Sequence, residues 1–396
     1  MNEQTSISPG DAEIAATITR IQGELRAHFR ASVDALKSAI ADYVAEGTLP
    51  PADAAFDYPA LRIIAEGKLR AGVKDHNLSF GRIDRAGDFV TTITRPDLFA
   101  DYLAEQLTLI LRHYDVRIEV TGSGQQIPFP YVLDPSGSTD MGGVAPLELA
   151  RHFPTTELAD IGDELADGLF GFDAAAEQPL ALFDALRTDF SLARLRHYTG
   201  TAPEHFQRYI LFTNYHRYVD EFVRWAGDQV GKGRYTALAG AAGLYVNQPG
   251  VDASQQVADS AWRRHQMPAY HLIAPDGDGI TLVNIGVGPS NAKTICDHLA
   301  VLRPEAWLMI GHCGGLRASQ RIGDYVLAHA YLRDDHILDE VLPPEIPIPP
   351  IAEVQQALAS AAGQVSGETG ADLKRRMRTG TVVTTDDRNW ELRFTT

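Results

Sequence analysis

The sequence has 396 residues, of which 44% are hydrophobic and 22% charged, values that are usual for soluble globular proteins of two or three domains. Its 35 Lys and Arg against 52 Asp and Glu give a formal net charge of −17, which disfavours nucleic acid and anionic membranes as partners. Two cysteines, Cys296 and Cys313, exclude a disulfide framework and suit a reducing compartment. The polar start and the lack of any run of about 18 apolar residues lead us to expect a soluble cytoplasmic protein.

Residues 1–180 combine helix and strand patterns. Apolar residues recur at three-and-four spacing from Ala12 to Glu46, and Gly47 follows, which predicts one long amphipathic helix. The other elements expected here are a hairpin at Leu78–Arg95, a helix from Pro96 to Leu111, a strand at Val116–Val120 and a long loop at Gly122–Gly143. Because these elements gather no catalytic residue types, an α+β domain with a regulatory or interface role fits them best.

The stretch from Ile280 to Leu316 predicts strand, glycine turn, helix, strand and second glycine turn. The apolar run Ile280–Ile285 is typical of a central parallel strand covered on both faces. A tight turn is allowed at Gly286-Val287-Gly288, after which Ser290 is expected to cap a helix over 291–302.

A second buried strand, Ala306–Ile310, is expected to run into the glycine turn that contains Gly311, Gly314 and Gly315. Two such turns on neighbouring parallel strands would meet where open α/β sheets bind ligands, and bare N–H groups there favour an anionic or sugar-like ligand. One alternative is that the glycines only let strand and helix pack closely. Another, a dinucleotide site, lacks the third glycine of its fingerprint.

Further elements are expected on either side of this stretch. They are strands at Tyr209–Thr213, Ile322–Ala330 and Thr379–Thr385, and a helix at Ile351–Val365. Before the first of them, Arg194, Arg196 and His197 lie close together in sequence and could hold a phosphate. The alternative for these three side chains is a solvated basic surface. Gly168–Pro179 marks a candidate domain boundary.

Several of these segments carry a resemblance to a known family. Gly286–Thr294, Gly311–Leu316, Ile322–Leu327 and Gly380–Asp386 resemble the successive motifs of the nucleoside phosphorylase and nucleosidase superfamily. The phrases HFPTTELADIGDELADG, DFSLARLRHYTGT and AYLRDDH are similar to those of the AMP nucleosidase family within it. The likeness runs over nearly the whole chain.

The resemblance implies a fold and an activity. The fold is an α/β catalytic domain of nucleoside-phosphorylase type over 181–396, with a mixed central sheet and flanking helices, preceded by the α+β N-terminal domain over 1–180. The activity is hydrolysis of the N-glycosidic bond of AMP to adenine and ribose 5-phosphate, with no metal or cofactor in the chemistry. The family further implies MgATP as an allosteric activator, phosphate as a regulator and a homohexamer.

The resemblance also implies binding positions. Arg217, in a loop after the first strand, and His197, twenty residues earlier, would contact the sugar or the 5′-phosphate, with Arg194 and Arg196 as further phosphate candidates. Thr385 and Asp386 would lie near the purine, on which Trp390 would stack, although covering a sheet edge is the alternative role for Trp390. The remaining implied substrate positions are Gly286, Gly288, Ser290, Gly311, His312, Gly314 and Gly315.

The chain departs from its relatives at two places. Met309 and His312 stand where related phosphorylases have an Arg and a Ser, and without that cation the attacking phosphate loses its partner, so hydrolysis is favoured. The family's Met-Glu ribose motif and its Ser-Asp motif, which supplies the general acid, do not occur within the 396 residues. No catalytic residue is therefore assigned, because the family acid would lie beyond Thr396.

From the second departure we expect a truncated chain that leaves apolar sheet surface open, associates and releases no adenine. Two other classes remain as alternatives: a non-catalytic nucleotide-binding or assembly protein, and a nucleoside phosphorylase.

Overall fold

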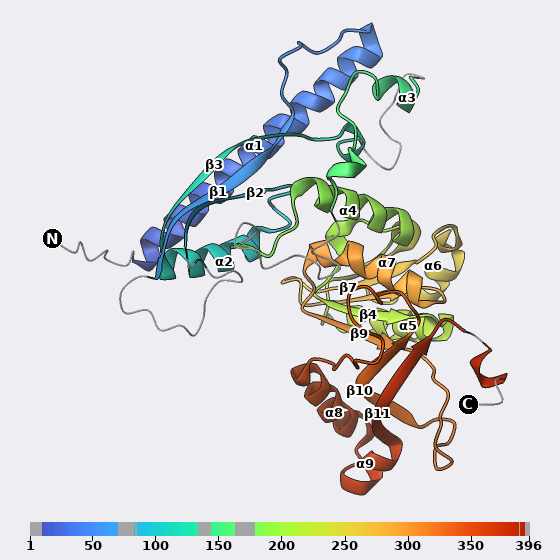
Figure 1. Ribbon diagram of the computed structural model, residues 1–396. Helices are drawn as coiled ribbons and strands as arrows, with labels where there is room; N and C mark the ends of the chain where they lie inside the picture. Colours follow the sequence, from blue (N-terminus) through green and yellow to red (C-terminus); the bar gives the residue numbers. More distant parts are fainter. Residues whose placement is uncertain are drawn as a thin grey trace, which may run out of the picture. The chain divides into compact units, whose positions relative to one another are not determined.

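The computed structural model describes residues 10–69, 83, 85–133, 144–162, 179–387 and 389–392. The chain divides into two compact units, residues 1–165 with 170–193 and residues 166–169 with 194–396. Helix α4 (Ala185–Thr199) supplies its residues up to Ala193 to the first unit and the rest to the second (Figure 1). The predicted boundary segment Gly168–Pro179 lies almost wholly outside the described residues.

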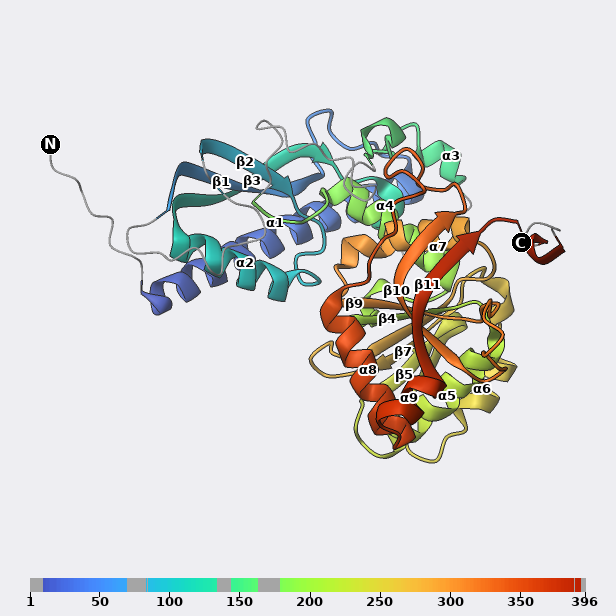
Figure 2. The ribbon, with the colours of Figure 1, turned by 60° about the horizontal axis from the view of Figure 1, so that its bottom comes forward.

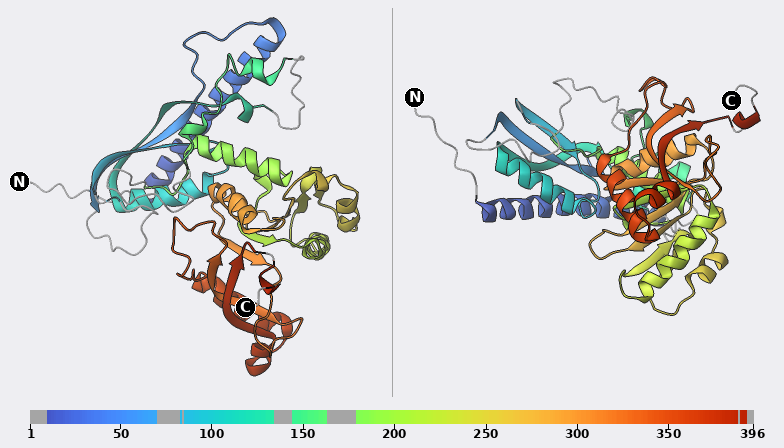
Figure 3. Two further views of the ribbon diagram at one scale, coloured as in Figure 1. Left: turned by 45° about the vertical axis from the view of Figure 1, so that its right-hand side comes forward. Right: turned by 90° about the horizontal axis from the view of Figure 1, so that it is seen from below.

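The first unit is built on a three-stranded antiparallel sheet of order β2-β1-β3. Its strands are β1 (Asp57–Leu69), β2 (Ala86–Thr92) and β3 (Tyr114–Gln126). Two helices, α1 (Asp11–Glu46) and α2 (Ala100–His113), cover the same face of the sheet (Figure 3). Shorter helical segments follow at η1 (Phe129–Tyr131), α3 (Pro146–Leu149) and η2 (Leu158–Asp160).

Helix α1 confirms the predicted long amphipathic helix. Gly47 ends it with φ of 70°, a left-handed conformation that glycine adopts without strain. Its apolar stripe is buried along two core clusters, of which the first contains Ile14, Ile18, Ile21 and Leu25, and the second Leu36 and Ile40. The predicted spacing therefore matches the buried face.

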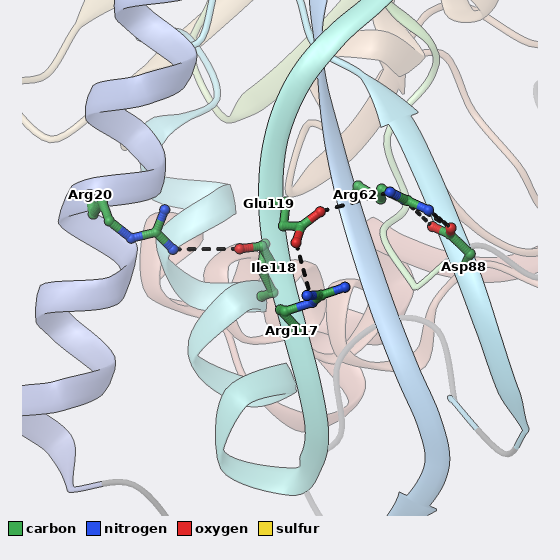
Figure 4. Close-up of polar contacts among 6 residues, drawn as sticks. All are labelled: Arg20, Arg62, Asp88, Arg117, Ile118 and Glu119. Atoms are coloured by element: carbon green, nitrogen blue, oxygen red, sulfur yellow. Dashed lines mark hydrogen bonds and ion pairs between the residues drawn. The ribbon is translucent and has the colours of Figure 1, made fainter.

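The opposite face of this sheet carries alternating charges (Figure 4). Arg62 lies between Asp88, to whose Oδ1 its Nε donates at 2.8 Å, and Glu119, which also pairs with Arg117 at 3.2 Å. The hydrogen bond from Arg62 lowers the pKa of the Asp88 carboxyl. Because these four charges are paired with opposite charges, across the strands or along β3, this face suits contact with water.

Two predicted boundaries in the first unit need correction, and one strand was not predicted. Strand β2 pairs with β1, and the first arm of the predicted hairpin lies almost wholly outside the described residues. Pro59 and the charged residues of β1 hide its strand character, so it was not predicted. Gly122–Gln126 belongs to β3 and not to a loop, and α2 begins at Ala100, not at Pro96.

The second unit contains a six-stranded sheet of order β6-β5-β7-β8-β4-β9 (Figure 2). Strand β4 (Tyr209–Thr213) is parallel to β8 (Ile280–Asn284) on one side and to β9 (Ala306–Ile310) on the other. The pairs of β5 (Ala237–Gly240) with β6 (Leu244–Val246) and β7 (Ala269–Ile273), and of β7 with β8, are antiparallel. The mixed sheet that the resemblance implied is confirmed.

Helices α5 (His216–Gly231), α6 (Ala253–Asp259) and α7 (Pro289–Leu299) complete this part of the unit. Val219, Val223 and Val230 of α5 are buried in one cluster with Leu238 of β5 and Leu282 of β8, which fixes α5 against the sheet. Short turns follow the helices and strands at η3 (Pro203–His205), η4 (Ala241–Gly243), η5 (Trp262–Arg264) and η6 (Ala300–Leu302).

Three predictions for the glycine-rich stretch were wrong in detail. The two glycine turns do not follow neighbouring strands, because β4 inserts between β8 and β9. Strand β9 was expected to be buried, but it lies at the edge of the described sheet and is half-buried, with Met309 47% exposed. Its apolar run looks the same in sequence as that of a central strand, so sequence could not show this. Ser290 does not cap α7, since Pro289 already occupies the first turn and Gly288 is the cap residue.

The rest of the unit holds a parallel pair, β10 (Tyr325–Asp334) with β11 (Met377–Thr385), beside α8 (Ala352–Ser366) and α9 (Gly370–Arg376) (Figure 2). The final element is η7 (Trp390–Leu392). Val383 is 50% exposed and α8 buries no residue, so apolar surface is open here as expected. Among the described helices, none combines the length and the apolar character needed to cross a bilayer.

Candidate functional site

The site is built at the carboxyl edge of three adjacent parallel strands, β8, β4 and β9. In the register of these strands, Thr213 of β4 pairs with Asn284 on one side and with Ile310 on the other. The residues that follow the three strands therefore leave the sheet at one level. This is the edge at which open α/β sheets bind ligands.

The first glycine turn, after β8, is held by side-chain amides. The backbone N–H of Gly286 donates to Oδ1 of Asn284 at 3.1 Å, and Nδ2 of Asn291 donates to the carbonyl of Val287 at 3.3 Å. Gly286 and Gly288 have φ of 67° and 110°, values that side chains other than glycine rarely adopt. The turn is thus a fixed approach to the N-terminus of α7, where Ser290 is exposed.

The second glycine turn, after β9, is flanked by aromatic rings. The ring of His312 lies 4.0 Å from that of Tyr215 and 5.6 Å from that of Tyr218, centroid to centroid. A Cβ on Gly314 would lie 3.0 Å from Cζ2 of Trp390, so the indole packs directly on the turn. The loop after β4 and the segment after β11 therefore both reach this turn.

The N-terminus of α5 opens at the same edge. Nδ2 of Asn284 and Nδ1 of His216 lie 3.3 Å apart, and the His216 ring lies 5.0 Å from that of Trp262. Arg217 lies in the first turn of α5, not in a loop, and is exposed, and among the described residues it has no hydrogen bond or ion pair. No acidic residue compensates this helix N-terminus, so the turn and the guanidinium together favour an anion.

The three cationic positions of α4 are not part of this cluster. His197 is exposed and its ring contacts Tyr198 at 5.4 Å, and the described contacts do not join it to either glycine turn. Arg196 acts on His205, whose pKa is lowered by burial and further by that positive charge. Arg194 is exposed on the same helix.

The residues after β11 lie at the carboxyl end of the β10–β11 pair. Thr385 Oγ1 accepts from the backbone N–H of Asp387 at 3.2 Å, and Asp386 is exposed. His336, in the loop after β10, pairs with Asp339, and this pairing raises the pKa of the imidazole. The charge of Asp386 adds to that effect. Gly315 packs against Gln320, with 3.1 Å from its Cβ position to the amide oxygen.

A buried hydrogen-bonded histidine in the sheet was missed from sequence. His271 of β7 is fully buried, with Nε2 2.9 Å from Thr201 Oγ1 and Nδ1 2.9 Å from Thr281 Oγ1. Thr199 donates to the carbonyl of Leu195 at 2.7 Å and lies 3.0 Å from Thr201 Oγ1. The single histidine within the apolar run AYHLI is the signal that points to it.

The donors of this network fix the proton on His271. The Thr199 hydroxyl donates its proton to the carbonyl of Leu195. Thr201 must therefore donate to Thr199 Oγ1 and accept from Nε2–H of His271. Thr281 accepts the backbone N–H of Gln207 at 2.9 Å and donates to Nδ1. A second proton, on Nδ1, would force the Thr281 hydroxyl to turn its hydrogen away from the ring, and burial lowers the pKa of His271 well below its usual range.

The two cysteines differ in their surroundings. Burial raises the pKa of the Cys296 thiol to about 12, so it stays protonated, and Cys313 is exposed in the second turn. The described part of the chain holds no group of three or more His, Cys, Asp or Glu side chains arranged to bind a metal ion.

Two family models match this chain, and together they cover most of it. A family model described as "Bacterial AMP nucleoside phosphorylase N-terminus" matches residues 20–177, and one described as "Phosphorylase superfamily" matches residues 236–393. The second unit thus has the nucleoside-phosphorylase-type fold. Among solved structures, an AMP nucleosidase from Bacteroides thetaiotaomicron is 29% identical, covers 52% of this chain and 71% of its own, and superposes with a TM-score of 0.38.

Among curated relatives, the AMP nucleosidases of Escherichia coli K12 and Escherichia coli O157:H7 are each 58% identical to this chain over 377 residues. The match covers 94% of this chain and 77% of each relative. Identity at that level over both units is far beyond what a shared fold requires. The chain belongs to the AMP nucleosidase family.

Proposed function

We propose that the protein hydrolyses the N-glycosidic bond of AMP and releases adenine and ribose 5-phosphate. The observation that carries the proposal is the 58% identity to two AMP nucleosidases over 94% of the chain. The site geometry supports it, because an anion-favouring helix N-terminus, two glycine turns and aromatic rings share one edge of the sheet.

In this proposal each part of the edge takes one part of the substrate. The 5′-phosphate lies at the N-terminus of α5 with Arg217, which can donate to it in a planar fork. The ribose lies over the glycine turns at Gly286 and Gly311, where the absence of side chains lets the sugar approach the backbone closely. The adenine ring lies near His312 and Trp390, which can contact its faces.

The chemical step is displacement at C1′ of the ribose. Water oxygen bonds to C1′ while the C1′–N9 bond breaks, its electron pair leaves with adenine, the base takes up a proton and the water loses one. Hydrolysis is preferred over phosphorolysis because Met309, 47% exposed at the end of β9, offers no charge to an attacking phosphate. Protonation of the base typically contributes about 10²–10⁴ in rate, and we assign that acid to no described residue.

We further propose MgATP activation, regulation by phosphate, a homohexameric assembly and a cytoplasmic location, as the family resemblance implies. A place for a regulator in the first unit is a cavity of about 470 Å³ lined in part by Phe56, Gln126, Arg151 and His152. Its lining includes two phenylalanine rings, Phe56 and Phe153, together with one guanidinium and one imidazole. Activity with and without MgATP in Arg151→Ala, and light scattering on the purified protein, test these proposals.

The function is tested by measuring adenine release by chromatography in two reactions. One contains AMP without phosphate, and the other contains adenosine with phosphate. Adenine release from AMP that needs no phosphate supports the proposal. Phosphate-dependent cleavage of adenosine would make the protein a nucleoside phosphorylase instead. Calorimetric binding of AMP with no release would favour a nucleotide-binding or assembly protein.

A further inference from the structure

Asn214 follows β4, the strand that lies between β8 and β9, and these two neighbours are followed by the glycine turns. The place of a Cβ on Gly311 lies 3.7 Å from Oδ1 of Asn214, so the amide oxygen lies against the second turn. Strand β8, with the first turn, borders β4 on its other side. The side chain therefore leaves the sheet between the two turns that the proposed function gives to the sugar.

The amide oxygen of Asn214 is shielded from solvent and accepts no hydrogen bond from any described residue. Asn284 of β8, which pairs with Thr213 in the register, differs in this respect, because its Oδ1 accepts from Gly286 and its Nδ2 lies 3.3 Å from Nδ1 of His216. A buried carbonyl oxygen without a donor is unfavourable, and such groups in folded proteins call for a specific explanation. At a ligand-binding edge that explanation is a donor that arrives with the reaction.

The surroundings define which donor this is. The segments 213–217, 284–291 and 311–316, which follow the three parallel strands, contain no Asp or Glu, so a cationic donor has no counter-charge on them. A neutral amide oxygen is well suited to accept from a neutral O–H group. In the proposed reaction the neutral O–H groups at the sugar are the ribose hydroxyls and the attacking water.

We propose that Oδ1 of Asn214 accepts a hydrogen bond from an O–H group at the reacting centre, either the attacking water or a ribose hydroxyl. This inference rests on the proposed function. Asn214 is then a positioning residue: it takes no proton, and it holds either the water oxygen against C1′ or the sugar ring in line with the departing base. Misplacement of a reacting group by about 1 Å can cost on the order of 100-fold in rate.

Two ratios, one of products and one of kcat/KM values, distinguish the two sources of the O–H group. In water with methanol, the ratio of ribose 5-phosphate to its methyl glycoside reports how firmly water is held. The ratio of kcat/KM for AMP to that for 2′-deoxy-AMP, or for 3′-deoxy-AMP, reports a hydroxyl contact. Neither ratio responds to a mere loss of folded protein.

The variants are Asn214→Ala, Asn214→Asp, which keeps an acceptor oxygen of the same shape, and Asn247→Ala as a control on an exposed asparagine outside the site. We expect Asn214→Ala to lower kcat for AMP by about ten- to hundredfold. We also expect it to change one of the two ratios at least threefold, with Asn214→Asp closer to wild type in that ratio. A changed methanol ratio assigns the water, and a changed deoxy ratio assigns the hydroxyl.

The inference is overturned if Asn214→Ala keeps kcat/KM within twofold of wild type, or if activity falls with both ratios unchanged. If the wild-type protein releases no adenine, the proposed function fails on its own. Asn214 is then judged by calorimetry, in which wild type and Asn214→Ala bind AMP and its two deoxy forms. Equal preferences in the two proteins overturn the hydroxyl contact and leave no support for the inference.

Discussion

The imidazole of His312 and the ring of Tyr215 face each other at 4.0 Å between centroids and 32° between planes. This contact joins the loop after β4 to the glycine turn after β9, two segments almost one hundred residues apart in sequence. Neither ring is deeply buried, so the contact costs or adds little to the stability of the core. Its effect should be on the shape of the edge.

We therefore expect His312→Ala to lower kcat/KM for AMP by roughly tenfold, because aromatic pairs of this kind are worth about 0.5–1.5 kcal/mol and the turn they hold faces the substrate. The unfolding midpoint should change little. His329→Ala, at an exposed histidine of β10, is the control. Parallel losses in both variants would argue against a role for the His312 contact.

Arg217→Ala tests the phosphate position at the N-terminus of α5. Since a hydrogen bond to a charged group contributes about 1.5–3 kcal/mol, KM for AMP should rise roughly ten- to hundredfold. Cleavage of adenosine, which lacks the phosphate, should change much less. Arg224→Ala, on the same helix but paired with Glu221 at 2.7 Å, is the matched control. The assignment fails if AMP and adenosine lose equally.

The buried network at His271 predicts how stability depends on pH. Because the folded protein holds this imidazole neutral, its pKa is lower folded than unfolded, and the unfolded chain binds one more proton below the unfolded pKa of about 6.5. The free energy of unfolding should therefore fall as pH drops through this value. Unfolding by urea at pH 5 to 8, in wild type and His271→Gln, measures it.

In His271→Gln the proton linkage of this site is removed, so its curve should be flatter between pH 5 and 7 even though the variant is less stable overall. The comparison isolates His271 from the other histidines, which both proteins share. Identical slopes in the two proteins would show that His271 does not titrate in the way its hydrogen bonds require.

A second buried group anchors the start of α4 in the first unit. Asp189 accepts from Tyr58 at 2.8 Å, from Thr94 at 2.9 Å and from Arg95 at 3.2 Å. Replacing it with Ala leaves these donors without their acceptor, so we expect a loss of about 3 kcal/mol of unfolding free energy. Asp42→Ala, at an exposed position of α1, should cost less than about 0.5 kcal/mol.

The open apolar surface of the β10–β11 pair should drive association of residues 1–396. Val383, 50% exposed, and Tyr325, 64% exposed, are two of its members. Val383→Thr with Tyr325→Thr keeps strand-forming residues while reducing that surface. Sedimentation at several concentrations should show less self-association in the double variant, and an unchanged profile would remove this surface as the cause.

The order of elements was largely predictable because periodicity and glycine turns are local. Helix α1 and strands β4 and β9 have nearly the predicted bounds. Sequence could not show that β4 separates β8 from β9, since strand order depends on packing between distant segments. For the same reason it missed β1, whose pairing on both sides outweighs its Pro59 and its charges.

Site residues could be predicted from sequence only where the backbone conformation requires one residue type. Gly286 and Gly288 are such cases, because their positive φ excludes most side chains. The contacts of His312 with Tyr215, and of Trp390 with Gly314, depend on tertiary placement, and no spacing indicates them. Asn214 was passed over since its significance lies in an unmet hydrogen bond, which a sequence does not record.

The sheet of the first unit ends at β3, whose outward carbonyl groups would ordinarily be open to another chain. Arg20 of α1 reaches over that edge and donates to the carbonyl of Ile118 at 3.5 Å (Figure 4). Glu24 pairs with the same guanidinium at 2.9 Å. A foreign strand could extend the sheet at this point only by displacing a paired arginine. The long helix therefore hinders the addition of another strand at this point of the β3 edge, in addition to covering the core of the unit.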